Sequence, residues 1–288
     1  MGLVSAKAML DDARKGHYAV GHFNLNNLEG IRAFLLAAQE NHSPIILGVS
    51  RGPAKYMGGY RTISDMVQNF MDALNITVPV ALHVDHGTYE EALDAIENGF
   101  SSVMFDGSGY PIDENIEKTR HVVELAHAKG ISVEAEVGAI GGVEDGVIAM
   151  GECADPDECA RIAALGVDFL AAGIGNIHGK YPSNWGGLNF DVLAAIREQV
   201  GDLPLVLHGG SGIPSEMVRK AIDLGICKVN VNTECQIAFT GAIKEYFIQK
   251  KDQEERWYIP QTVLEPGIEA MKRVCIEKMT LFGSIGKA

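Results

Sequence analysis

The chain has 288 residues, and its 47% hydrophobic and 22% charged content is ordinary for a globular enzyme. The formal net charge of −14 argues against broad contact with a nucleic-acid backbone or an anionic membrane, so an anionic substrate would need a local positive centre. No apolar run approaches the roughly 20 residues of a membrane span, and the first residues lack a basic segment with an apolar core. We therefore expect a cytoplasmic protein.

Short apolar runs alternate with amphipathic helical runs along the chain. Their spacing predicts strands at 18–24, 44–50, 78–82, 102–106, 131–136, 167–172, 203–207 and 227–232. It predicts helices at 5–15, 28–41, 63–74, 89–98, 113–129, 155–165, 189–199 and 214–224. The strands are continuously apolar, which is typical of a parallel sheet covered by helices.

Eight strand–helix units are also the number that closes an α/β (β/α)₈ TIM barrel. An open doubly wound sheet is the alternative, but no Gly-x-Gly-x-x-Gly motif follows the first strand. We expect a single domain over 1–288, with the barrel ending at about 235 and a C-terminal helical extension at about 236–288. That extension should pack on a neighbour or reach over the barrel.

The chain has five cysteines, and none of them forms a Cys-x-x-Cys pair. An odd number without an export signal is most simply explained by reduced and mostly packed side chains. The spacing gives little support to a zinc–thiolate site. The cysteines are Cys153, Cys159, Cys227, Cys235 and Cys275.

Three of the apolar runs end in a histidine that is followed by glycine, namely at His86, His178 and His208. In a (β/α)₈ barrel the carboxyl ends of the strands share one mouth, so these imidazoles should meet. Three neutral imidazoles suit Zn²⁺ and leave a fourth position for substrate. One such histidine alone would more simply be a hydrogen-bonded core residue, but three together favour a metal site. His83 is expected to support the ligands or to lie in the core.

Other polar residues stand at the predicted strand ends and should line the same mouth. They are Asn24, Ser50, Asp85, Asp106, Glu134, Glu136, Asn230 and Asn232.

A glycine-rich segment at 138–146 follows the fifth strand and has four glycines in nine residues. Glu144 lies within it, so a mobile loop could deliver a base and exclude water on closing. A solvated acidic loop explains the same residues equally well.

The segment His208-Gly209-Gly210-Ser211-Gly212 precedes the helix at 214–224. Free amide groups at the start of that helix would form an anion cradle, which Asn232 and Thr233 would complete. The simpler alternative is a tight turn with Ser211 near an N-cap. No lysine ends the sixth strand, so metal chemistry is favoured over an imine. These features together predict carbonyl chemistry on a phosphorylated sugar.

Five motifs in combination resemble the class II, metal-dependent fructose-bisphosphate aldolases of the shorter bacterial type. They are LHVDHG at 82–87, VEAEVG at 133–138, GGVED at 141–145, HGGSG at 208–212 and NVNTE at 230–234. The resemblance covers nearly the whole chain. The same family contains aldolases for tagatose bisphosphate and deoxy-ketogluconate phosphate.

The resemblance implies reversible, zinc-dependent cleavage of fructose 1,6-bisphosphate through a metal-stabilised enediolate. The products would be dihydroxyacetone phosphate and glyceraldehyde 3-phosphate. His86, His178 and His208 would bind the catalytic Zn²⁺. Asp85 would be the acid and base at the aldehyde oxygen, and Glu144 would exchange a proton with dihydroxyacetone phosphate.

The resemblance also implies roles for further residues and partners. Asn230 would bind the ketose hydroxyls, Asn24 and Ser50 would line the aldehyde side, and Asp106 and Glu136 match an alternative, more buried metal position. A monovalent cation (Na⁺ or K⁺) or a second divalent ion is expected, as is a homodimer or homotetramer. The phosphate would be held by Gly179, Gly209, Ser211, Asn232 and Thr233.

Two positions depart from the family pattern. Gln261 stands where an arginine commonly meets the distal phosphate from a partner subunit, and Gly109 replaces a usual histidine. Arg51 could compensate for the first change. The sequence therefore leaves open another ketose phosphate, such as tagatose 1,6-bisphosphate, a deoxy-ketogluconate phosphate or a sulfo-sugar phosphate. A TIM-barrel metallohydrolase is the alternative from another class, and a non-catalytic binding protein would be expected to lack Asp85 or Glu144.

Overall fold

The computed structural model describes residues 2–144, 147–149, 152–249 and 258–288, and for residues 143, 144 and 147–149 it describes the backbone alone. Eight parallel strands close into a barrel, as predicted. In order round the barrel they are β1 (Val20–Asn24), β2 (Ile45–Val49), β3 (Val80–Gly87), β4 (Ser102–Phe105), β5 (Ser132–Val137), β8 (Phe169–Ala172), β10 (Leu205–Leu207) and β11 (Ile226–Val231).

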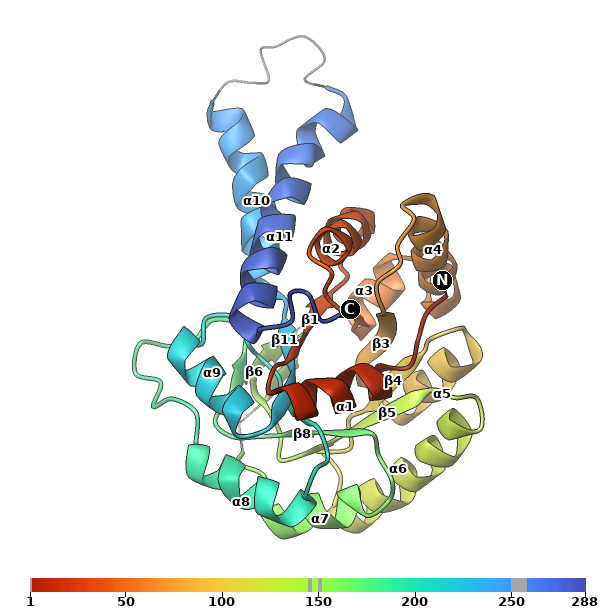
Figure 1. Cartoon of the computed structure of the whole chain (residues 1–288), viewed down its shortest axis with the longest axis vertical. Helices are drawn as coiled ribbons and strands as arrows, with labels where there is room; N and C mark the ends of the chain where they lie inside the picture. Colours follow the sequence, from red (N-terminus) through yellow and green to blue (C-terminus); the bar gives the residue numbers. More distant parts are fainter. Residues whose placement is uncertain (1, 145–146, 150–151, 250–257) are drawn as a thin grey trace.

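Helices surround this barrel in the alternation that the sequence predicts (Figure 1). They are α2 (Leu28–Glu40), α4 (Tyr60–Ala73), α5 (Tyr89–Glu97), α6 (Ile112–His127), α7 (Pro156–Ala163), α8 (Phe190–Val200) and α9 (Ser215–Asp223). The structure adds α3 (Arg51–Tyr56), which the periodicity missed. Six residues are too few to show a helical repeat, and this helix contains both a glycine and a proline.

Helix α1 (Ala6–Gly16) closes the amino end of the barrel. Its buried face, with Met9 and Leu10, packs in one cluster with interior residues of the strands such as Ile46 and Val206. The amide of Ala6 donates to the Ser132 hydroxyl, which ties the start of the helix to β5. Access to the interior is therefore from the carboxyl ends of the strands, the end that carries active sites in such barrels.

The C-terminal extension consists of α10 (Thr233–Ile248) and α11 (Pro260–Phe282). The two helices extend together away from the barrel, and α11 then returns to pack on α2 and β1 (Figure 1). Lys272 pairs with Glu40 of α2 at 2.6 Å, and Phe282 is buried. The extension is thus anchored on the helical shell beside β1. The described part of the chain has no helix that is long and apolar enough to cross a membrane.

A small second sheet lies outside the barrel, with order β7-β6-β9. β6 (Gly141–Glu144) pairs antiparallel with β7 (Val147–Ala149) and parallel with β9 (Ile177–His178). The segment expected to be a loop at 138–146 is therefore partly a β-ribbon, and His178 belongs to this sheet and not to the end of β8. Gly142 has φ +102°, and a Cβ atom there would lie 2.2 Å from the backbone oxygen of His178. Only glycine permits this pairing.

The reactivity of the five cysteine thiols tests whether four of them are buried as the structure indicates. Burial raises the pKa of Cys159 and Cys235 to about 12 and that of Cys227 to about 11, and Cys275 is fully buried, whereas Cys153 is exposed. We expect the native protein to titrate one fast-reacting thiol per chain with an aromatic disulfide reagent, and five after unfolding. A Cys153→Ser variant should lose the fast phase. Any fast-reacting thiol in that variant would contradict the burial of the other four cysteines.

Candidate active site at the mouth of the barrel

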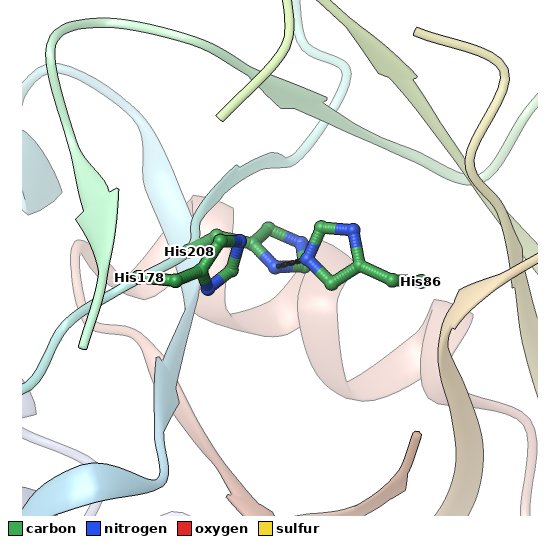
Figure 2. A group of neighbouring side chains, drawn as sticks. All are labelled: His86, His178 and His208. Carbon is green, nitrogen blue, oxygen red and sulfur yellow. Dashed lines mark hydrogen bonds between the residues drawn. The ribbon is translucent and has the colours of Figure 1, made fainter. Parts of the chain in front are cut away.

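Three histidines from separate elements point toward one another at the mouth (Figure 2). His86 lies on β3, His178 on β9, and His208 directly after β10. One nitrogen from each ring can be chosen so that all three lie within 4.8 Å of one another. The ring centroids of His86 and His208 are 4.4 Å apart, and those of His86 and His178 are 4.7 Å apart. The structure thus brings together the three imidazoles that the sequence analysis proposed as metal ligands.

The local backbone of β3 explains how two consecutive residues reach the same mouth. Side chains of a regular strand alternate between faces. The pairing of β3 with β4 shifts register between Val84 and Gly87, and His86 adopts a left-handed φ of 48°. An irregularity of this kind re-aims side chains and is common beside active sites. Asp85 and His86 can therefore both serve the site.

The hydrogen bonds of the imidazoles assign their protons. Nδ1 of His86 lies 2.8 Å from the Asp106 carboxylate, and Nε2 of His208 lies 2.8 Å from the Glu134 carboxylate. Burial raises the pKa of each carboxyl group, but the neighbouring groups outweigh it: the pKa of Asp106 is lowered to about 2, mainly by His86, and that of Glu134 lies well below its usual value, mainly because of Lys228. Ionised carboxylates only accept, so these ring nitrogens carry the protons.

When both rings are neutral, their opposite nitrogens, Nε2 of His86 and Nδ1 of His208, present lone pairs to each other at 2.8 Å. Two facing lone pairs repel unless a proton or a cation lies between them. Burial lowers the pKa of His208 to about 4 and that of His178 to about 2, with repulsion from His86 adding to both effects. Neutral imidazoles held by carboxylates on their far sides are the donor set that a divalent metal ion prefers. The residues therefore fit such an ion.

A second set of donors adjoins the first, because His86, Asp106 and Glu136 also bring ligand atoms within 4.8 Å of one another. Burial, reinforced by the charge of Asp106, raises the pKa of Glu136 well above its usual value. One buried oxygen of Glu136 has no hydrogen-bond partner among the residues that the structure describes. A cation would satisfy that oxygen, so these residues too fit the metal position that the sequence suggested.

Asp85 is 2% exposed and lies beside the imidazoles. It accepts hydrogen bonds from Asn24 Nδ2 at 2.7 Å and from Asn230 Nδ2 at 3.1 Å. Burial raises the pKa of this carboxyl group, but the nearby imidazoles of His22, His86 and His208 outweigh it, so the pKa lies below the usual range. Asp85 is thus an ionised carboxylate in the mouth, which can accept a proton from a bound hydroxyl group.

A cavity of about 140 Å³ opens at this mouth. Most of the residues that the sequence analysis proposed for substrate line it, but Ser50 does not: its buried side chain is at the N-cap of α3. Gln236, which the sequence analysis did not single out, also lines the cavity. The full lining is Asn24, Asp85, His178, Gly179, Gly209, Ser211, Asn230, Asn232, Thr233 and Gln236.

The anion cradle differs in detail from the predicted one. Helix α9 begins only at Ser215, and the helix whose first residue lines the cavity is α10, which starts at Thr233. The amide of Gly212 donates to the Glu234 carboxylate, and the amide of Gly210 donates to the Asn230 carbonyl. The amino end of α10, with its positive dipole, replaces the amino end of α9 as the feature suited to an anion, and its Glu234 amide donates to Ser211 Oγ at 3.2 Å.

Two side chains that the sequence analysis missed extend this wall of the cavity. Gln236 Nε2 donates to Asn26 Oδ1 at 3.1 Å, and Asn26 Nδ2 donates to Asn232 Oδ1 at 3.0 Å. Gln236 stands three residues after Thr233, about one helical turn further along α10, so the sequence spacing could have indicated that both side chains face the cavity. Asn26 gave no such signal, because its partners are more than 200 residues away in sequence.

Glu144 is the one proposed catalytic residue whose side chain lies outside the described part of the structure. Glu144 is the last residue of β6. Gly142, two residues earlier on the same strand, pairs with the proposed metal ligand His178. The strand that carries Glu144 is therefore linked directly to the strand that carries His178.

This chain is similar in sequence and in fold to known aldolases. A family model described as class-II fructose-bisphosphate aldolase matches residues 4–287. The chain is 52% identical to a fructose-bisphosphate aldolase from Mycoplasma pneumoniae, over 99% of this chain and 100% of that protein. It is 50% identical to one from Streptococcus pyogenes, over the full length of both. The crystal structure of the YdjI aldolase from Escherichia coli K12 superposes with a TM-score of 0.84 at 35% identity, covering 99% of each chain.

Proposed function

This chain belongs to the class-II fructose-bisphosphate aldolase family, and we propose that the mouth of its barrel catalyses the reversible cleavage of fructose 1,6-bisphosphate. The products are dihydroxyacetone phosphate and glyceraldehyde 3-phosphate. The enzyme is a metal-dependent lyase of glycolysis. The observation that supports this site above all is the pair of facing imidazole nitrogens, 2.8 Å apart, beside the ionised carboxylate of Asp85.

His86, His178 and His208 would hold the catalytic metal ion, and we propose Zn²⁺ because three imidazoles with one open position suit that ion. When bound, the ion polarises the ketone and stabilises the negative charge that develops beside it. Asp106 and Glu136, with His86, would form an alternative, more buried position for the metal ion. A monovalent ion such as Na⁺ or K⁺ would lie near Gly179 and Ser211.

Asp85 would accept the proton of the hydroxyl group on the fourth carbon of the sugar. The bond between the third and fourth carbons then breaks, the aldehyde forms, and the electron pair moves to the third carbon and the adjoining carbonyl group. Asn24 and Asn230 donate to Asp85 from two sides and hold its carboxylate in place. Glu144 would return a proton to the third carbon, which releases dihydroxyacetone phosphate.

The phosphate of the dihydroxyacetone half would lie at the wall of the cavity formed by Gly179, Gly209, Ser211, Asn232 and Thr233. Thr233 is the first residue of α10, so the helix amino end supplies an attraction that the net charge of the protein does not. We further propose that the protein acts in the cytoplasm and assembles as a homodimer or homotetramer.

Gln261 favours keeping a second candidate, the same cleavage of another ketose phosphate. It lies near the start of α11, is exposed, and is neutral where the family commonly has an arginine. A neutral amide binds a distal phosphate less strongly than a guanidinium group does.

The test is a kinetic screen of the purified enzyme with fructose and tagatose 1,6-bisphosphates and with ketose phosphates that carry a carboxylate or sulfonate at the far end. We expect the highest kcat/KM for fructose 1,6-bisphosphate and complete loss of turnover with EDTA. Release of tritium from labelled dihydroxyacetone phosphate separates an aldolase from a metallohydrolase. Turnover that survives chelation, or no tritium release, would refute the proposal.

A further inference from the structure

A lysine is completely buried below the mouth of the barrel. Lys228 lies on β11 and has 0% exposure, and it is not among the residues that line the cavity. Taking an ammonium group out of water costs several kcal/mol unless close partners compensate. Lys228 Nζ has two such partners, Glu134 Oε2 at 2.8 Å and Asn230 Oδ1 at 2.9 Å. Both partners also contact groups of the proposed active site.

The first contact leads to His208. Glu134 presents one carboxylate oxygen to Lys228 and the other to His208 Nε2, each at 2.8 Å. His83 Nε2 lies 3.1 Å from the oxygen that faces Lys228. A carboxylate paired with an ammonium group accepts hydrogen bonds only, so it holds the proton of His208 on Nε2 and leaves the Nδ1 lone pair toward the other imidazoles.

The second contact leads to Asn230, whose amide can in principle take two orientations. Because Oδ1 accepts from Lys228, Nδ2 must face the mouth, where it lies 3.1 Å from Asp85 Oδ1 and 3.0 Å from His208 Nδ1. The flipped amide would point its oxygen at a carboxylate and at a nitrogen lone pair, and its NH₂ group at an ammonium group. All three contacts would then be repulsive.

We propose that Lys228 is a positioning residue of the aldolase site, which fixes His208 through Glu134 and fixes the amide of Asn230 directly. The inference rests on the proposed function for the roles of His208 as metal ligand and Asn230 as binder of the substrate hydroxyls. It explains why the barrel accommodates a buried ammonium group at a position where an apolar side chain would pack more simply. A purely structural ion pair would not need to contact the amide of Asn230.

The test compares a single with a double variant, because a change at Lys228 or at Glu134 alone leaves the other charge of the buried pair without its partner. Glu134→Gln weakens the acceptor for His208, and Glu134→Gln with Lys228→Met removes both charges together. Lys272→Met is the matched control, because it also breaks a Lys–Glu pair, the one with Glu40 at 2.6 Å, away from the mouth. Metal-free protein is titrated with Co²⁺ by calorimetry, the visible Co²⁺ spectrum is recorded, and thermal unfolding is measured.

We expect Glu134→Gln to lower the Co²⁺ affinity about 10–100-fold and to change the spectrum, as replacing partners of metal ligands usually does. Adding Lys228→Met should leave the Co²⁺ affinity near that of Glu134→Gln but weaken binding of dihydroxyacetone phosphate by a further factor of about 10, because the Asn230 amide then loses one of the three contacts that fix its orientation. The control should match the wild-type protein in each measurement.

Wild-type Co²⁺ affinity and spectrum in the double variant would overturn the role toward His208. Equal binding of dihydroxyacetone phosphate in the two Glu134→Gln variants would overturn the role toward Asn230. These outcomes are independent of the kinetic screen: a wild-type enzyme that prefers another ketose phosphate would refute the substrate assignment and leave the expected Co²⁺ changes intact.

Discussion

Replacement of His178 by alanine should remove the catalytic metal ion and lower kcat for fructose 1,6-bisphosphate cleavage on the order of a thousandfold. A Lewis-acid metal contributes several kcal/mol to the transition state, and each 1.36 kcal/mol is a factor of ten in rate. His178 is the informative ligand to remove, because it lies on β9 of the small outer sheet, whereas His86 and His208 bind carboxylates that follow or belong to barrel strands. Its loss should therefore disturb the fold least.

The measurement is the zinc content of the purified variant by atomic absorption, together with kcat and the thermal midpoint. His121→Ala is the matched control, because His121 is an exposed residue of α6 that contacts Tyr89 on the outside of the barrel. We expect the control to keep full metal content and rate. A His178→Ala protein with stoichiometric zinc and a normal rate would show that the metal ion is held elsewhere.

The barrel itself could be predicted because its strands are encoded locally. Segments such as Ile45–Val49 and Phe169–Ala172 are apolar enough to be buried on both faces, and the helices between the strands show a clear 3.6-residue period. Once eight units are counted, the geometry of the barrel brings the strand ends to one mouth. The meeting of His86 and His208 follows from that rule, although 122 residues separate them.

The ribbon β6–β7 could not be predicted in this way. Its strands hold glycines and an acidic residue, and one of its partners, β9, is only two residues long and lies more than 30 residues further on. Pairing between such short segments depends on tertiary context and not on local pattern. The same reason hid the true position of His178, which the sequence analysis placed on the continuation of the sixth barrel strand.

The sequence contains a signal for the contacts of Lys228 with Glu134 and Asn230. Lys228 and Asn230 are two residues apart on one strand, as are Glu134 and Glu136 on another, so each pair shares a face. A lysine among buried residues of an interior strand is costly and should have a counter-charge. The sequence contains the requirement for a partner, but only the closed barrel identifies Glu134 as that partner, 2.8 Å away.

Replacement of Asp85 by asparagine should lower the rate of fructose 1,6-bisphosphate cleavage about 10²–10⁴-fold, the usual contribution of a general acid or base. The variant keeps the size of the side chain but cannot accept the proton of the sugar hydroxyl group. Exchange of the proton on dihydroxyacetone phosphate should continue, because we assign that proton transfer to Glu144. The measurements are a coupled cleavage assay and tritium release from labelled dihydroxyacetone phosphate.

Glu144→Gln is the matched variant, and it should differ from Asp85→Asn in the exchange reaction. It should lose tritium release while keeping zinc and the binding of dihydroxyacetone phosphate, and its steady-state cleavage should slow as well, because Glu144 returns the proton that releases that product. The difference between the variants depends on two carboxylates acting on different atoms, Asp85 at the mouth on the hydroxyl group of the fourth carbon and Glu144, from the ribbon that pairs with β9, on the third carbon. If both variants lost cleavage and exchange equally, one carboxylate would be serving both steps, and the assignment of separate roles would be wrong.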